Sequence, residues 1–400
     1  MTKDFWAKYA VFIYIILWIV YNLQDILMLK GLIAQFIFVA LMAMSFYACY
    51  EVNNHYRVSP YIKWLNIMLT VLTLYGAALM VGGEAVHKGR FLHKVVSNYS
   101  YLQGIYISVM PIYAFYYYTL KRQLVPQNII VVFLLLFSFS VVSYYQQYFK
   151  VSYSSGKDDI VNNIGFLFVP LIPMLSIVKM KSIWKYSLAL LSFGFIMLSM
   201  KRGAILTGGV MLLLFMQHNI KARTKTQLAS TFALLMAAIF VLYRFVENLY
   251  ATNAFFQKRL AITLEGNSSL RDKLYGFFWQ YFTERTSPLE FFFGQGANGT
   301  LALYGQYAHN DWLEFAINQG LLGIIIYAVY WCIFIWVWKD YRGLHNNQMA
   351  LGDLIIAYFL ISLFSMSFGN MPLTATLCIG YCLAYNRPNM YLQIPKNYER

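Results

Sequence analysis

The sequence predicts an all-α membrane protein that crosses a bilayer many times. Of its 400 residues, 60% are hydrophobic and only 12% are charged, whereas soluble domains carry about 25% charged residues. The apolar residues gather in runs long enough for helices that cross a hydrocarbon core of about 30 Å, which needs roughly 20 residues. Tyrosines are common at the ends of these runs, where aromatic rings settle at headgroup level.

Twelve apolar runs predict about twelve transmembrane helices. They cover residues 9–29, 31–49, 61–83, 101–120, 128–147, 161–179, 183–200, 203–218, 227–247, 315–338, 353–369 and 372–386. The first run follows MTKDFWAK without a small-residue cleavage signature, so we interpret it as a retained helix rather than a signal peptide. Residues 1–400 are therefore expected to form a single transmembrane domain.

The charges of the connections predict the orientation of these helices. With twelve helices and an inner N-terminus, 17 Lys and Arg residues fall on the inner side and 8 fall in the short outer connections. Because Lys and Arg are enriched in cytoplasmic loops, both termini are expected in the cytoplasm. The net charge of +15 is then a topology signal rather than a sign of nucleic-acid binding.

One outer connection, residues 247–312 between the ninth and tenth predicted helices, is much longer than the others. Long loops tend to be functional, and this one contains an apolar stripe with the spacing of an amphipathic helix. The stripe consists of Leu270, Leu274, Phe277, Phe278 and Tyr281. We expect Ser268 or Ser269 to be its N-cap, and the helix to lie on the membrane surface or over the bundle.

Residues 307–323, YAHNDWLEFAINQGLLG, place polar side chains directly before the tenth predicted span. If Asp311 is the N-cap, Glu314 occupies the third helical position and the pair forms a capping box. His309 precedes this helix N-terminus, whose partial positive charge favours a neutral imidazole that can accept a proton. The same charge attracts anions. The alternative is that His309 is an interfacial polar residue without a chemical role.

Basic residues on the predicted outer face are candidate anion ligands. Lys201 and Arg202, in LSMKRGAIL, either snorkel to the interface or bind an anion such as phosphate, Arg202 in bidentate fashion. Arg271 lies in the first turn of the amphipathic helix, where a bound anion would offset the unfavourable helix dipole. Arg90 belongs to HKGRFLHK, residues 87–94, which is either a second anion-binding patch or a solvated loop.

Two further motifs favour structural interpretations. GQGANG, residues 294–299, fits the G-x-G-x-x-G pattern, but no parallel-sheet unit surrounds it, so its glycines are expected to allow tight turns rather than dinucleotide binding. Asp158 and Asp159 form an outer carboxylate pair that we expect to cap the helix beginning near Ile160 rather than to bind a metal. The sequence predicts neither a metal nor another cofactor.

Taken together, these features resemble the O-antigen ligase and O-antigen polymerase superfamily of bacterial polysaccharide enzymes. The resemblance rests on about twelve helices, on the late outer loop, and on three motifs within residues 195–325: LSMKRGA, SSLRDKLYGFFWQ and AHNDWLEFAINQGLLG. Lys201 stands where a Ser is commoner in the family. The resemblance implies a C-type glycosyltransferase-like membrane fold at the inner membrane, with its active face extracytoplasmic.

The resemblance also implies roles for individual residues. Arg202 and Arg271 would hold the diphosphate of an undecaprenyl-diphosphate-linked glycan, and His309 would be the essential acceptor-side residue. Beyond the resemblance, we expect Lys201 to be a further diphosphate ligand and Asn310 and Arg90 to be supporting residues. The reaction in the family is metal-independent and inverts the sugar carbon.

These residues and the resemblance predict the same chemistry, in which an acceptor sugar hydroxyl attacks the anomeric carbon as the diphosphate departs. In a repeat-unit polymerase of O-antigen, capsule or exopolysaccharide the acceptor is a second lipid-linked glycan. In a ligase the acceptor is lipid A-core or a protein side chain; we lean to the polymerase. The expected partners are this donor, one of these acceptors, membrane lipids and other polysaccharide-assembly proteins, without nucleic acid. A transporter or flippase of lipid-linked saccharides would instead favour charges buried in mid-helix. A non-catalytic scaffold would leave His309 dispensable.

Overall fold

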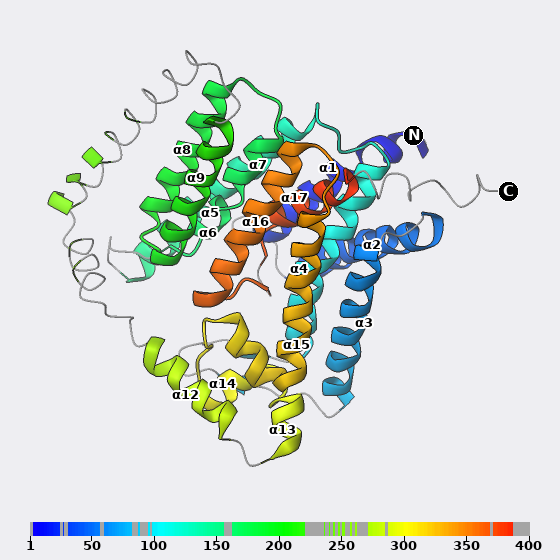
Figure 1. Cartoon of the computed structure of the whole chain (residues 1–400), viewed down its shortest axis with the longest axis vertical. Coiled ribbons are helices and arrows are strands. Elements are labelled where there is room, and N and C mark those ends of the chain that lie inside the picture. Colours follow the sequence, from blue (N-terminus) through cyan, green and yellow to red (C-terminus); the bar gives the residue numbers. More distant parts are fainter. Residues whose placement is uncertain are drawn as a thin grey trace. The chain divides into compact units, whose positions relative to one another are not determined.

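The computed structural model is almost entirely helical over the residues that it describes (Figure 1). Those residues are 3–24, 27, 31–56, 60–81, 87–88, 95–96, 98–155, 162–220, 271–284, 287–368 and 371–386, with scattered positions between 236 and 261. They divide into two compact units, Met1–Val125 with Arg271–Arg400, and Pro126–Leu270. That the whole chain forms one transmembrane domain stays a prediction.

The first unit contains the N-terminal helices and the C-terminal third of the chain. Its helices are α1 (Lys3–Asn22), α2 (Leu32–His55), α3 (Pro60–Val81), α4 (Asn98–Leu120), α12 (Arg271–Thr283), α13 (Pro288–Phe293), α14 (Gly299–Tyr304), α15 (Asp311–Lys339), α16 (His345–Phe364) and α17 (Leu373–Ala384). The two-residue strands β1 (His87–Lys88) and β2 (Val95–Val96) pair antiparallel.

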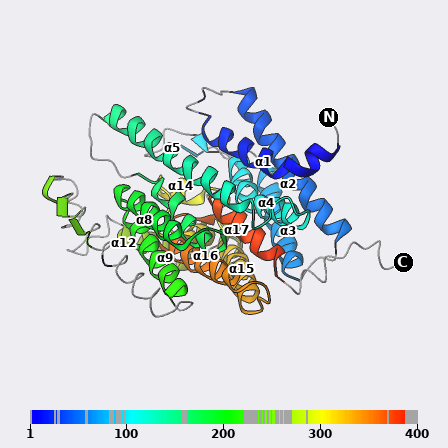
Figure 2. The ribbon, with the colours of Figure 1, turned by 90° about the horizontal axis from the view of Figure 1, so that it is seen from above.

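Within this unit α4 packs against α2 and α17 (Figures 1 and 2). The close approach of α17 requires Gly380, because a Cβ there would lie 2.6 Å from the Ile112 carbonyl oxygen of α4. Buried aromatic side chains fill the core around these helices, among them Tyr113, Phe115 and Tyr381. α15 contacts α3 and α16 along its length and the short helices α12, α13 and α14 near its beginning (Figure 1).

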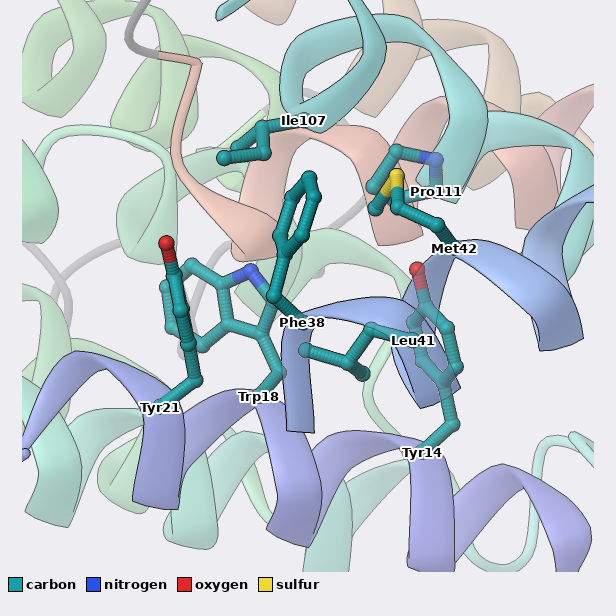
Figure 3. Close-up of a pocket in the computed structure, with 8 residues that line it drawn as sticks. All are labelled: Tyr14, Trp18, Tyr21, Phe38, Leu41, Met42, Ile107 and Pro111. Carbon is teal, nitrogen blue, oxygen red and sulfur yellow. The ribbon is translucent and has the colours of Figure 1, made fainter. Parts of the chain in front are cut away.

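A recess between α1, α2 and α4 is lined by apolar side chains (Figure 3). Trp18 and Tyr21 of α1 face Phe38 and Leu41 of α2 across it, and Pro111 of α4 borders it. Pro111 lies inside α4, where a proline removes one helical hydrogen bond. The recess belongs to the helical scaffold, and its lining contains none of the residues predicted to act on a substrate.

The second unit contains α5 (Ile129–Ser155), α6 (Gly165–Phe168), α7 (Leu171–Ile177), α8 (Ser182–Leu198) and α9 (Arg202–Ile220). α6 and α7 pack on α8, and the Phe168 and Phe195 rings stack with centroids 4.8 Å apart. The span predicted at 161–179 is therefore two short helices rather than one. Pro170 lies at the junction, where it has no backbone N–H to continue the helix.

Eleven of the twelve predicted runs coincide with helices, and the run at 227–247 lies largely outside the described residues. Four described helices are long and apolar enough to cross a membrane, by length and composition: Leu32–His55, Ile129–Lys150, Asp311–Lys339 and His345–Phe364. Shorter apolar helices cover Tyr9–Asn22, Gly165–Ile177, Ser182–Leu198 and Leu373–Ala384. The helical class is as predicted for a membrane protein, whereas the number of spans and their orientation stay predictions.

Candidate active site at the start of α15

α12 is the amphipathic helix predicted in the long loop, and it begins at Arg271. Its buried face consists of Leu274, Phe278 and Phe282, which pack on α15 residues such as Ile317. The predicted stripe was partly wrong, because Phe277 is exposed on the flank of the helix beside Tyr304. Leu270 and the two serines predicted as N-caps lie outside the described residues. The helix therefore covers the beginning of α15.

His309 occupies the bend between α14 and α15 in a left-handed conformation, with φ of 54°. Residues other than glycine adopt this region rarely. The Tyr275 hydroxyl of α12 donates to the His309 carbonyl oxygen at 3.0 Å, and the backbone N–H of Ala308 donates to the Glu314 carboxylate. Contacts on both sides of His309 thus hold the turn, which leaves the imidazole half-buried.

Asn310, rather than Asp311, is the N-cap of α15. Its backbone is extended, with φ of −151°, and its side-chain oxygen accepts a hydrogen bond from the backbone N–H of Leu313 at 3.1 Å. Asp311 is then the first helical residue and Glu314 the fourth, so the predicted capping box is wrong. The physical reason is the left-handed turn at His309, after which the chain enters the helix one residue earlier than the sequence pattern indicates.

Asp311 instead ties the beginning of α15 to the segment between α16 and α17. Its buried carboxylate accepts hydrogen bonds from the backbone N–H groups of Ser367 and Phe368, from the Ser367 hydroxyl, and from the Tyr327 hydroxyl at 2.9 Å. A buried carboxylate is tolerated only when such donors replace water. Asp311 is thus a structural anchor of the helix that follows His309.

Glu314 ties α15 to α14 and to the His309 turn. Besides the Ala308 N–H, its carboxylate accepts from the Thr300 hydroxyl at 2.7 Å and from the Asn318 side-chain amide at 3.3 Å. Thr300 belongs to α14 and Asn318 to α15, so one buried side chain joins three segments. Glu314 is therefore a positioning residue for the turn rather than a group exposed to a substrate.

The C-terminus of α16 brings Arg271 and Asn310 together. The Arg271 guanidinium donates to the Phe364 carbonyl oxygen at 2.7 Å, and the Asn310 side-chain amide donates to the Leu363 carbonyl oxygen at 2.8 Å. The last carbonyls of a helix lack helical partners and carry partial negative charge. Because a guanidinium has five N–H donors, the contact with Phe364 does not exhaust the capacity of Arg271 to bind an anion.

Tyr275 connects Arg271 with the His309 turn. It lies one turn after Arg271 in α12, and its hydroxyl reaches the His309 carbonyl oxygen. Burial raises the pKa of Tyr275, while the positive charge of Arg271 opposes that rise. The phenol is therefore protonated at neutral pH and able to donate. The structure thus gathers a cation, a hydroxyl and a histidine at the same end of α15.

α15 is broken near its beginning rather than continuous. Gly320 has φ of 67° and ψ of −152°, and the helix resumes directly after it. The break frees the carbonyls of the preceding turn, and the loop after α13 pairs with them: the Gln295 N–H donates to Ile317 O at 2.8 Å and the Gly296 N–H to Asn318 O at 2.9 Å. Gly294 and Gly296 both have positive φ. As predicted, these two glycines of GQGANG allow tight turns, whereas the third, Gly299, is the first residue of α14.

Lys201 and Arg202 lie in the second unit, at the turn between α8 and α9. Met200 adopts a left-handed conformation with φ of 51°, which ends α8 before Arg202 opens α9. The Ser199 carbonyl oxygen accepts from the Asn162 N–H at 2.8 Å, and the Lys201 N–H donates to the Ser199 hydroxyl at 3.3 Å. Both basic side chains are half-buried. Arg90, Asp158 and Asp159 lie outside the described residues.

Residues 187–328, from α8 into α15, match the family model described as O-antigen ligase. The chain contains an O-antigen ligase domain. Arg202, Arg271 and His309 all fall within the matched residues, and the resemblance seen in the sequence at 195–325 is confirmed. The match supports a membrane enzyme of the O-antigen ligase or polymerase type, with glycosyltransferase-like chemistry. No curated protein matches the chain.

Several residues that shape the site are not predicted by the sequence motifs. The one signal for Tyr275 is its position one helical turn from Arg271, which places both on one face of α12. Thr300 and Ser367, which hold Glu314 and Asp311, carried no signal, because a single hydroxyl residue in a loop or short helix matches no motif. Their contacts depend on segments that are distant in the chain.

Proposed function

We propose that this protein is a metal-independent, inverting glycosyltransferase that moves a glycan from undecaprenyl diphosphate to an acceptor sugar hydroxyl. The reaction would take place at the outer face of the bacterial inner membrane. The observation that carries the proposal is that Arg271 and Asn310, the neighbour of His309, both bind the end of α16. Arg271 and His309 themselves fall within the residues that match the O-antigen ligase model. A guanidinium proposed to bind an anion is thereby linked to the turn that carries the proposed proton acceptor.

In the proposed reaction the acceptor oxygen attacks the anomeric carbon from the side opposite the diphosphate. The bond from this carbon to the diphosphate oxygen breaks, so the configuration inverts. The hydroxyl proton passes to His309, whose neutral form is favoured by the helix N-terminus that follows it. General-base catalysis of this kind contributes about 10²–10⁴-fold. The carrier diphosphate is already a good leaving group, so the reaction needs no nucleotide or metal.

Negative charge grows on the departing diphosphate, and Arg271 is proposed to stabilise it. A preorganised guanidinium does so most effectively where water is excluded. Arg202 and Lys201 are proposed as further diphosphate ligands, supported by the LSMKRGA motif within the matched residues. Asn310 would support the site by capping α15, and Arg90 by its charge.

Arg202→Lys is expected to lower kcat/KM for transfer by about 10–100-fold. Lysine retains the charge but not the planar pair of donors, and a hydrogen bond to a charged group contributes about 1.5–3 kcal/mol. The measurement is the initial rate of transfer at several donor concentrations. Arg342→Lys, at an exposed position between α15 and α16, is the matched control. Equal rates for the two variants would contradict bidentate binding by Arg202.

Tyr275→Phe is expected to lower kcat about fivefold, because one neutral hydrogen bond contributes about 1 kcal/mol and this one positions His309. The variant keeps the ring that packs beside α15, so its apparent Tm should fall by only a few degrees. Tyr304→Phe, on the exposed part of α14, is the control and should leave kcat unchanged. A wild-type kcat for Tyr275→Phe would show that His309 does not depend on this contact.

Acceptor choice distinguishes polymerase from ligase. Purified protein in liposomes would be given undecaprenyl-diphosphate glycan, with a second copy or lipid A-core as acceptor. We favour the polymerase, which would form a ladder of products with the first acceptor, whereas a ligase would make a single addition to the second. Absence of new glycosidic bonds with both acceptors, in protein that remains folded, would contradict the proposed transferase.

A further inference from the structure

α13 presents an apolar face that the rest of the described protein does not cover. Leu289, Phe292 and Phe293 are 69%, 50% and 50% exposed. They fall at i, i+3 and i+4, which places them on the same side of the helix. Phe291 points elsewhere, and its ring stacks on Phe282 of α12 with centroids 5.2 Å apart. Large exposed apolar patches mark surfaces that meet another apolar phase or a partner.

The contacts of α13 define its position along the axes of α3 and α15. The Tyr75 hydroxyl of α3 lies 3.0 Å from the Phe293 carbonyl oxygen and 2.7 Å from the Asn318 carbonyl oxygen of α15. Near the other ends of these two helices, the rings of Tyr61 and Trp336 pack with centroids 4.8 Å apart. The two contacts between α3 and α15 thus mark two levels, and the end of α13 lies at the first.

These levels are separated by less than the thickness of the hydrocarbon core. Tyr61 to Tyr75 spans about 21 Å at about 1.5 Å per residue, and Asn318 to Trp336 spans about 27 Å before the break at Gly320 is considered. Tryptophan and tyrosine rings near helix ends mark the membrane interface. With a core of about 30 Å, Phe293 is then expected near the edge of the hydrocarbon opposite to Tyr61 and Trp336, which the predicted orientation makes the outer edge.

We propose that α13 is an interfacial anchor whose Leu289, Phe292 and Phe293 side chains insert among the lipid acyl chains of the outer leaflet. The neighbouring helices α3 and α15 also expose apolar side chains, such as Leu74 and Ile325, so lipid that covers them would also cover α13. Gln295 and Gly296, which follow directly, bind the carbonyls before Gly320. The anchor thus fixes the beginning of α15 relative to the lipid surface.

Spin labels on α13 would test this contact. Cys49 and Cys332 would be replaced by alanine, leaving the buried Cys378 and Cys382 in place. Leu289→Cys and Phe293→Cys would each be labelled and reconstituted in phosphatidylethanolamine and phosphatidylglycerol liposomes. Collision rates with oxygen, which concentrates in lipid, and with a water-soluble nickel chelate would be compared. Ile325→Cys supplies the lipid reference and Glu284→Cys, exposed after α12, the water reference.

Labels at residues 289 and 293 are expected to match the lipid reference, with several-fold more oxygen collisions and several-fold fewer nickel collisions than the label at residue 284. Nickel accessibility equal to that of the water reference would overturn the proposal. Protection from both reagents would also overturn it, since it would mean that protein covers α13. The measurement needs no catalytic turnover, so it decides lipid contact whether or not the proposed function holds.

Discussion

His309→Ala is expected to lower the rate of glycan transfer by about 10²–10⁴-fold, the contribution of a positioned general base. The imidazole is the group proposed to take the acceptor proton, and the turn that carries it is held by Tyr275 and Glu314. The rate would be measured with saturating donor and acceptor in liposomes. At saturation the loss should appear in kcat, since the proposed diphosphate ligands are unchanged.

Alanine at this position also changes the backbone, because residue 309 has φ of 54°. Asparagine tolerates the left-handed region better than alanine does, but it cannot act as a base. His309→Asn is therefore the matched variant: loss of activity in both variants assigns the effect to the imidazole. If His309→Asn transferred glycan at the wild-type rate, backbone conformation rather than proton transfer would be the contribution of this residue.

Gly320→Ala is expected to destabilise the protein by about 3 kcal/mol or more, because it combines backbone strain with a steric clash. The φ and ψ of 67° and −152° lie in a region that is essentially restricted to glycine. A Cβ would also lie 2.5 Å from the Phe291 carbonyl oxygen and 2.7 Å from the Gly294 nitrogen. The loop after α13 would have to move away from α15.

Apparent Tm in detergent, together with limited proteolysis between α13 and α14, would measure this effect. Gly276→Ala is the control, because Gly276 lies within α12 and a Cβ there meets nothing within 4 Å. Alanine is also the better helix former, so the control should be neutral or stabilising. Equal Tm values for the two alanine variants would show that the packing of α13 on the break contributes little to stability.

The sequence by itself determined the helical class of the protein, most of its helices and the resemblance of residues 195–325 to the O-antigen ligase family. These properties depend on the length of apolar runs, on helical periodicity and on short motifs, all of which are local in the chain. The same local information identified Arg202, Arg271 and His309 as candidates. It also identified the glycines of GQGANG as turn residues, which Gly294 and Gly296 confirm.

Only the tertiary structure decided how the beginning of α15 is built. The N-cap of α15 is Asn310 and not the predicted Asp311, because contacts from Tyr275 and Glu314 hold the His309 turn in a left-handed conformation. The sequence does not predict the break at Gly320, because Gly320 lies within an apolar run and composition does not determine the conformation of a glycine. The sequence likewise did not show that Arg271 and Asn310, the neighbour of His309, both bind the end of α16. Hydrogen bonds between segments distant in sequence leave no periodic pattern, so they become visible only when the chain is folded.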